Sequence, residues 1–189
     1  MEGQAALSPA QRTREALLDA GDQLAESEGF AGMTVSRITA AAGVAKGTFY
    51  LHFEDRDAYV RALHARFYDR VQAAIEEARQ AAQPDEDVAW TSLETYLDAC
   101  LRNRAIRILL LEARNSGVLA QAVDERRRAF VDDAEPALAA LGFIHPRASA
   151  WLLLAMVSEI ALQEMDAGQR DPQARAALRA FLRGAARAD

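Results

Sequence analysis

The sequence has a single cysteine, Cys100, and a single lysine, Lys46, among its 189 residues. One cysteine excludes an intramolecular disulfide, so a disulfide-stapled secreted scaffold is ruled out and we expect a cytoplasmic protein. The longest apolar run, Ala150 to Val157, is much shorter than the about 20 residues that a membrane-spanning helix needs. The first residues contain neither a basic nor an apolar stretch, so we expect no signal peptide and no membrane partner.

Signatures of metal sites and of common enzyme sites are also missing. The histidines, His52, His64 and His145, form no Glu-x-x-His or His-x-x-x-His pair, so we expect no metal site. The sequence contains no Gly-x-Ser-x-Gly, no phosphate loop and no dinucleotide-binding fingerprint. We therefore predict a protein without enzymatic activity or cofactor, and an enzyme remains the main alternative class.

Strand signals are scarce and helix start and stop signals are frequent, which predicts an all-α fold. Ser8 followed by Pro9 should start a first helix, and Gly29 should end it. Short second and third helices are expected from Thr34 to Gly43 and from Ala45 to His52. Longer helices are expected at 55–82, 87–103, 104–115, 118–141, 147–167 and from 171 onward. We thus predict a helix-turn-helix domain at 8–54 and a helical bundle at 55–189, joined by the long helix at about 55–82.

The second and third helices have the pattern of a helix-turn-helix. Their apolar residues can share one small core with the first helix, and the predicted core residues are Leu17, Leu24, Ile38, Ala42, Val44, Phe49 and Phe53. The third helix then presents polar residues to solvent, as a helix in the major groove of DNA does. No Asp or Glu occurs from Gly29 to Phe53, although 28 residues of the chain are acidic. Such a surface suits contact with phosphates; the alternative is a helical hairpin buried against the bundle.

This segment resembles the DNA-binding head of the tetracycline-repressor (TetR/AcrR-like) family of bacterial transcriptional regulators. The similarity runs from Thr13 to about His64, and the motifs that carry it are Leu17-Leu-Asp-Ala20, Gly29-Phe30, Met33-Thr-Val35, Ala41-Ala-Gly-Val44, Lys46-Gly-Thr-Phe-Tyr50 and His52-Phe53, followed by Arg56. The resemblance implies a ligand-responsive repressor that binds a palindromic operator in double-stranded DNA as a homodimer. It further implies release by a small, largely apolar effector.

The resemblance also implies roles by position. Residues at the front of the second helix should meet phosphates, those at the start of the third helix should lie in or beside the major groove, and later ones should hold the DNA backbone. The predicted DNA-binding residues are Thr34, Ser36, Arg37, Lys46, Gly47, Thr48, Tyr50, His52 and Arg56. For Thr34 a plain N-cap role is the alternative, and both roles can coexist. Ala45 stands where the family often has Ser or Thr, so the third helix lacks a side-chain cap worth about 1 kcal/mol.

The last two helices are apolar enough to form a four-helix interface between two copies of the chain. The predicted dimer-interface residues are Leu154, Met165, Ala174, Leu178, Phe181 and Leu182; the alternative is a core within one chain. Four arginines, Arg175, Arg179, Arg183 and Arg187, recur on the other face of the last helix. We expect that face to be solvated or to pair with Glu159 and Glu164, rather than to bind nucleic acid or membrane.

An effector pocket is expected among the middle helices, because aromatic side chains with one acid suit an apolar ligand that carries a cationic group. The predicted pocket residues are Trp90, Tyr96, Leu97, Cys100, Phe130, Trp151, Met156 and Glu159. The alternative for each is an ordinary core position. For Cys100 a redox role is the further alternative to a small buried hydrophobe. A third reading of the whole chain is a helical dimer that binds a ligand or a protein but no DNA.

Replacing Lys46 by Ala or Tyr50 by Phe should weaken operator binding, because each change removes a group that reaches the DNA while the core positions stay intact. A mobility-shift titration at fixed salt measures the effect, and far-ultraviolet circular dichroism checks that helicity is unchanged. A double variant that binds as tightly as the unaltered protein would show that the third helix does not contact DNA.

Overall fold

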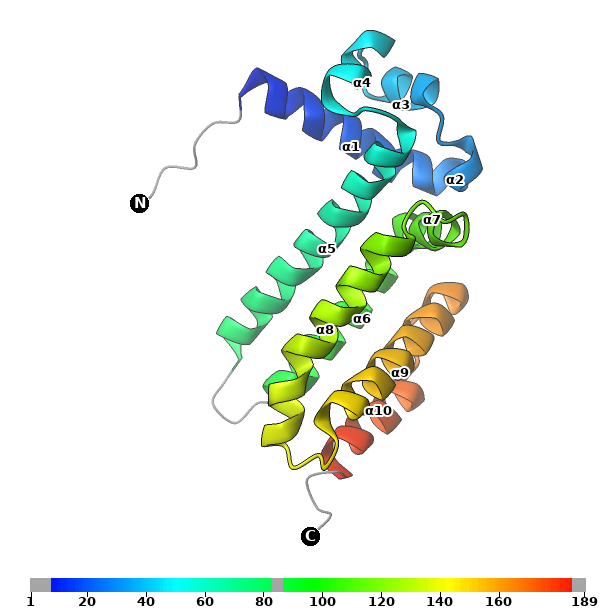
Figure 1. Cartoon of the computed structure of the whole chain (residues 1–189). Helices are drawn as coiled ribbons and strands as arrows, with labels where there is room; N and C mark the ends of the chain where they lie inside the picture. Colours follow the sequence, from blue (N-terminus) through cyan, green and yellow to red (C-terminus); the bar gives the residue numbers. More distant parts are fainter. Residues whose placement is uncertain (1–7, 83–86, 185–189) are drawn as a thin grey trace. The chain divides into compact units, whose positions relative to one another are not determined.

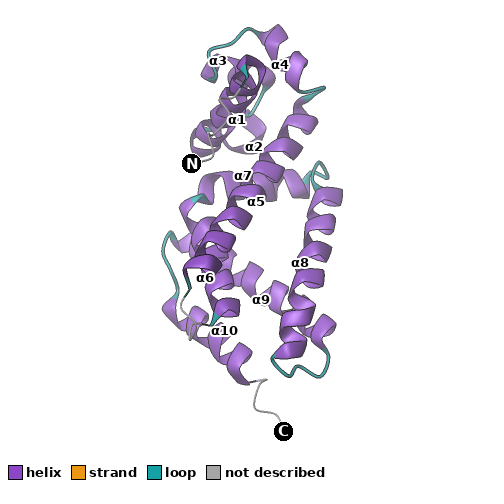
Figure 2. Cartoon of the chain, turned by 90° about the vertical axis from the view of Figure 1, so that its left-hand side faces the viewer, coloured by secondary structure: helices purple, strands orange, loops and turns teal. Residues whose placement is uncertain are grey.

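A computed structural model of the protein describes residues 8–82 and 87–184 (Figure 1). Within these ranges every regular element is an α-helix and no strand occurs (Figure 2), which confirms the predicted all-α fold. The chain forms two compact units: the first reaches to Phe67 and includes Ala105–Ala120, and the second comprises Tyr68–Arg104 and the chain from Gln121 onward. The sequence analysis placed the end of the helix-turn-helix domain at residue 54, and this functional boundary stays a prediction.

The first unit contains the two short helices that the sequence predicts. Its elements are α1 (Pro9–Ser27), α2 (Gly29–Gly32), α3 (Val35–Ala41), α4 (Lys46–His52), the first part of α5 (Arg56–Ala81) and nearly all of α7 (Arg104–Asn115). α1 packs against α2 and α3, and α3 packs against α4. At the start of α1, the Ser8 hydroxyl accepts a hydrogen bond from the Gln11 backbone at 3.2 Å, and the Gln11 side chain accepts one from the Ser8 backbone at 2.8 Å. This reciprocal cap confirms the predicted helix start.

The end of α1 differs from the prediction. α1 stops at Ser27, and Gly29, with a φ of +63°, opens the four-residue helix α2, which the sequence analysis did not predict. The core prediction holds for the large side chains: Leu17, Leu24, Ile38, Phe49 and Phe53 are buried. Ala42 and Val44 are only half-buried.

Tyr59 ties α5 to α1 inside the first unit. Its side chain has no exposed surface, and its hydroxyl donates a hydrogen bond to the Leu17 carbonyl at 2.7 Å. Burial raises the pKa of the Tyr59 phenol, so the hydroxyl remains a donor at neutral pH. A Cβ at Gly21 would lie 2.4 Å from the Tyr59 oxygen. Gly21 is therefore required for the close approach of α1 and α5.

The second unit is a bundle of longer helices. It contains the rest of α5, α6 (Val88–Arg102), nearly all of α8 (Ala120–Ala140), α9 (Pro146–Ala167) and α10 (Pro172–Gly184). α6 packs against α9, and α10 packs against both. Asp171 caps α10 as predicted, since its Oδ1 accepts hydrogen bonds from the backbones of Gln173 at 2.9 Å and Ala174 at 3.0 Å. Gly168, with a φ of +70°, ends α9 in the left-handed conformation.

A buried ion cluster joins three helices of this unit. Arg175 of α10 is 5% exposed and Glu164 of α9 is 1% exposed. The guanidinium donates two hydrogen bonds to Glu164, each of 2.7 Å, and a third to Asp98 of α6 at 2.8 Å. The sequence predicts that this arginine face is either solvated or paired with Glu159 and Glu164, and Arg175 confirms the second possibility through Glu164. Arg175 is buried because it pairs with the Glu164 carboxylate, and a buried charge is stable only when it is paired.

The predicted dimer-interface residues divide into two groups. Three of them are buried within the unit, namely Met165, Leu178 and Leu182. Their burial agrees with the alternative prediction, a core within one chain. Phe181 is 37% exposed, and Leu154 and Ala174 are half-buried. The dimer itself stays a prediction.

α9 also exposes apolar side chains, among them Leu152 at 61% and Leu162 at 40%. By length and composition, α9 is the one helix in the described part of the chain that could cross a membrane, with a mean hydropathy of 1.2 over its most apolar window. Of that window 39% is buried in the protein, and core helices of soluble proteins often have the same composition.

Replacing Arg175 by Ala should lower the free energy of unfolding by about 3–5 kcal/mol, because it leaves the Glu164 carboxylate buried without its charged partner. The matched control is Arg183→Ala on the same helix, where the side chain is exposed and the expected loss is below about 0.5 kcal/mol. Urea unfolding followed by circular dichroism compares the two variants. Equal losses for both would mean that the cluster does not stabilise the second unit.

Candidate nucleic-acid interface

α3 and α4 form the predicted helix-turn-helix in the first unit. Thr34 caps α3, its hydroxyl accepting from the Arg37 backbone at 3.4 Å, so the N-cap role is confirmed. The chain turns at Gly43, whose φ is +67°, and a residue with a Cβ would be strained there. Ala45 then precedes α4 without a side-chain cap, as the sequence predicts.

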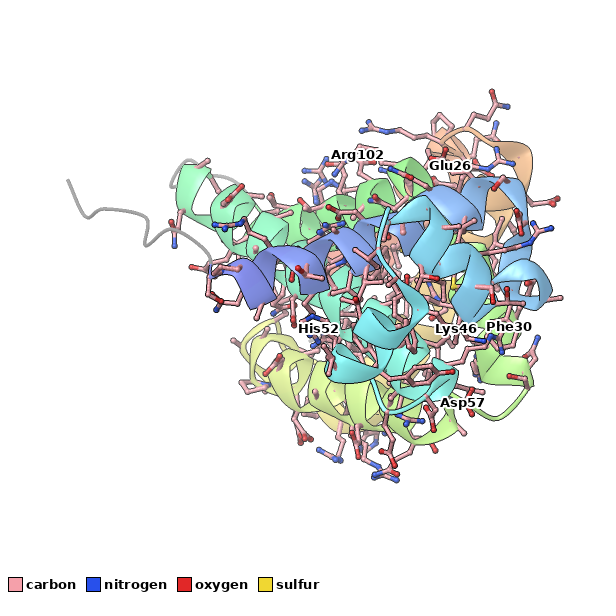
Figure 3. All side chains as sticks on the ribbon, turned by 90° about the horizontal axis from the view of Figure 1, so that it is seen from above. Glu26, Phe30, Lys46, His52, Asp57 and Arg102 are labelled. Atoms are coloured by element: carbon pink, nitrogen blue, oxygen red, sulfur yellow. The ribbon has the colours of Figure 1, made fainter. Side chains whose placement is uncertain are left out.

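The burial of Phe49 fixes which side of α4 faces solvent. Phe49 is 0% exposed and packs edge-on against the Tyr50 ring, with the centroids 5.4 Å apart, while Tyr50 itself is 53% exposed. The remaining predicted DNA-binding residues of α4 are exposed at Lys46 and Gly47 and half-buried at Thr48 and His52. Figure 3 looks onto this surface and labels Lys46 and His52 at the two ends of α4. The helix thus presents a polar surface, in line with the prediction.

Leu51 is the exposed residue of α4 that the sequence analysis missed. Its side chain is 83% exposed, more than any other large apolar side chain in the described part of the chain. The signal was present in the sequence, because Phe49 and Phe53 lie one helical turn apart and Leu51 falls between them on the opposite side. A single exposed leucine is common on protein surfaces, so its exposure alone does not indicate a partner.

The front of α3 contributes three exposed predicted residues, Thr34, Ser36 and Arg37. The Arg37 guanidinium forms an ion pair with the Glu28 carboxylate, Nη1 to Oε1, within the same unit. Glu28 lies directly before the acid-free segment in the sequence, which begins at Gly29. The polar surface at the front of α3 therefore has a carboxylate beside it, that of Glu28.

Arg56 is placed differently from the other predicted residues. Its Nε donates to the Met33 carbonyl at 2.7 Å, its Nη2 donates to the Phe30 carbonyl, and its guanidinium stacks 4.1 Å from the centre of the Phe30 ring. Glu112 of α7 also contacts α2, since its carboxylate accepts a hydrogen bond from the Phe30 backbone at 2.9 Å. Arg56 therefore braces α2 and the segment leading into α3, and its predicted phosphate contact stays a prediction.

The predicted pocket residues lie in the second unit, and their common pocket stays a prediction. Trp90, Leu97 and Cys100 are buried, Tyr96, Phe130 and Met156 are half-buried, and Trp151 and Glu159 are exposed. A concavity of about 500 Å³ lies at the turn between α9 and α10, and its lining residues are Gln163, Glu164, Ala167, Gln169, Arg170, Asp171, Pro172 and Gln173. No group of three or more His, Cys, Asp or Glu side chains suited to a metal ion occurs among the described residues.

A turn between two short helices, with an inward apolar core and an outward polar helix, defines a helix-turn-helix protein. Residues 17–63 match the family model described as "Bacterial regulatory proteins, tetR family". The chain is 39% identical over 62 residues to the HTH-type transcriptional repressor DhaR of a Mycobacterium species, covering 33% of this chain and 31% of that one. It is 37% identical over 71 residues to the HTH-type transcriptional repressor NemR of Escherichia coli, covering 38% and 36%. The matched segment spans about a third of the length of these relatives.

Solved structures extend the likeness to nearly the whole chain. A TetR-like transcriptional regulator from Rhodococcus sp. RHA1 matches with a TM-score of 0.73 at 20% identity, over 96% of this chain and 100% of that one. A TetR-family regulator from Pectobacterium atrosepticum matches with a TM-score of 0.71 at 24% identity, over 97% of each. At these identities the likeness shows the fold, namely a helix-turn-helix head followed by a helical bundle. The family match applies to the head, residues 17–63, and for the rest of the chain the solved structures show a shared fold.

Replacing Arg56 by Ala should lower the stability of the protein without DNA by about 1–3 kcal/mol, because two hydrogen bonds from a charged donor to backbone carbonyls are lost. The control is Arg61→Ala, an exposed arginine further along α5 whose nearest carboxylate oxygen, on Asp55, lies 4.0 Å away. Thermal unfolding in the absence of DNA measures both. An unchanged melting curve for Arg56→Ala, with duplex binding weakened, would instead assign this residue to phosphate contact alone.

Proposed function

We propose that this chain is a ligand-responsive transcriptional repressor that binds a palindromic operator as a homodimer. The observation that carries the proposal is the surface of α3 and α4, where Lys46, Gly47 and Tyr50 are exposed while Phe49 beneath them is fully buried. A polar helix held outward in this way matches the side that a recognition helix presents to the major groove. The names of the curated relatives, both transcriptional repressors, support the same function.

Individual contacts follow from the chemistry of the exposed groups. Lys46 at the first position of α4 suits the acceptor atoms of guanine, and Leu51 suits the methyl group of thymine. Thr34 and Ser36 suit phosphate oxygens, and the Tyr50 hydroxyl suits the sugar-phosphate backbone. These contacts predict a protein that reads only a few bases in each half-site.

The homodimer is proposed from the exposed apolar side chains of the last two long helices. Leu152 and Leu162 of α9 and Phe181 of α10 are each at least 37% exposed. A two-fold pair of chains would present two copies of α4, and DNA recognition by such pairs requires half-sites about 34–36 Å apart, one turn of the double helix.

The proposed effector is a small, largely apolar molecule that binds the second unit. The proposal is supported by Trp90, Leu97 and Cys100, which are buried apolar side chains on α6. α5 belongs to both units and is about 40 Å long at 1.5 Å per residue, so it is the element through which a ligand would change the spacing of two heads. The effector must then bind the free protein more tightly than the DNA complex. A regulator of this kind works in the cytoplasm, where its operator lies.

Selection of duplexes from a random pool with the purified protein tests the proposal. The expected result is an enriched palindrome with half-sites about one helical turn apart. Binding of that duplex should fall linearly with salt on a double logarithmic plot. A scrambled duplex of the same length serves as the control. A pool that shows no enrichment at low ionic strength would favour a ligand-binding helical protein that does not contact DNA.

A further inference from the structure

Arg37 is the cation at the front of α3, and the structure already gives it an anionic partner. Its side chain is 57% exposed, and its Nη1 forms an ion pair with Oε1 of Glu28. The hydrogen bond that Arg37 donates to the Glu28 carboxylate, and then the charge of that carboxylate, raise the pKa of Arg37 above its usual value. The Arg37 guanidinium is therefore accessible to solvent and at the same time paired with Glu28.

The Glu28 side chain is mostly buried and lies beside α2. It stands between α1 and α2, where it makes no side-chain cap to α2, and its side chain is only 22% exposed. The carboxylate lies over Gly32: a Cβ at that glycine would come within 2.7 Å of the Glu28 Cβ and 2.8 Å of Oε2. Among the described residues, the buried Oε2 has no hydrogen-bond partner. Among the described residues, the Glu28 carboxylate is thus paired through Oε1 with Arg37.

We propose that Glu28 competes with DNA for Arg37, holding the cation on the protein until a phosphate displaces the carboxylate. The inference rests on the proposed function and adds a residue that limits affinity. A cation already paired with a carboxylate gains little when it exchanges that partner for a phosphate, and the displaced Glu28 carboxylate then lies close to the DNA and repels it. Neither effect requires a change in fold.

Glu28→Gln should therefore strengthen operator binding, because it frees Arg37 and removes the negative charge. The expected gain is about 3–10-fold near 0.1 M salt. The slope of log affinity against log salt should become steeper by about one phosphate contact. Fluorescence anisotropy with the selected duplex, at three or more salt concentrations, measures both quantities.

A double-mutant cycle separates the ion pair from a general charge effect. Arg37→Ala should cost little in the unaltered protein and about tenfold in the Glu28→Gln background, where the arginine is free to reach phosphate. The matched control is Glu26→Gln, which makes the same change in net charge at an exposed position of α1 (Figure 3). It should raise affinity less than Glu28→Gln does and should leave the cost of Arg37→Ala unchanged.

Equal gains for Glu28→Gln and Glu26→Gln, or an equal cost of Arg37→Ala in both backgrounds, would overturn the inference while leaving the proposed function in place. A lack of duplex binding by the unaltered protein at low salt would overturn the proposed function itself. Circular dichroism checks that Glu28→Gln is folded. If that variant does not fold, Arg37→Ala in the unaltered protein tests the inference. A loss of duplex affinity of tenfold or more would then show that Glu28 does not keep Arg37 from the DNA, and it would overturn the inference.

Discussion

The surface that α4 can present depends on the aromatic cluster of Phe49, Phe53 and Tyr59. The ring centroids of Phe49 and Tyr59 lie 5.5 Å apart and those of Phe53 and Tyr59 lie 5.0 Å apart, and all three side chains are buried. A helix of seven residues is too short to be stable alone, so these contacts determine its rotation about its own axis. Tyr59 passes the constraint on to α1 through its hydrogen bond to the Leu17 carbonyl. The polar side of α4 is thus exposed because its aromatic side is fixed.

The same unit shows that a segment free of acids in the sequence is not free of them in space. Glu28 pairs with Arg37, and Glu112, from a distant part of the chain, accepts a hydrogen bond from Phe30 at the edge of the acid-free stretch. Arg56 is likewise engaged with backbone carbonyls. Electrostatic attraction for a nucleic acid therefore depends on which cations are free of partners, and a count along the sequence overestimates it.

Local signals in the sequence predict the fold well, whereas contacts between distant residues escape them. Ser8, Thr34 and Asp171 each cap a helix within three residues of their own position, so the residue type was enough to identify the helix start. Arg56 reaches carbonyls more than twenty residues away, and Arg175 reaches Asp98 on another helix. No periodicity reports such pairs, because a charged residue on a helix face looks the same in the sequence whether solvent or a buried carboxylate lies opposite. That is why the exposed polar residues of the candidate site could be predicted while the partners that hold them could not.

The second unit illustrates the same limit for apolar residues. α9 is apolar around most of its circumference, so its sequence does not distinguish a face that packs inside the chain from one that is left for a second copy. The structure shows how one side of α9 packs inside the chain, since Glu164 is buried and binds Arg175 of α10 with both carboxylate oxygens. A bidentate pair has a specific geometry, so it fixes the rotation of α10 against α9 as well as their separation. With that rotation set, Leu178 is buried and Phe181 is partly exposed, so the buried ion pair determines which apolar side chains of α10 reach solvent.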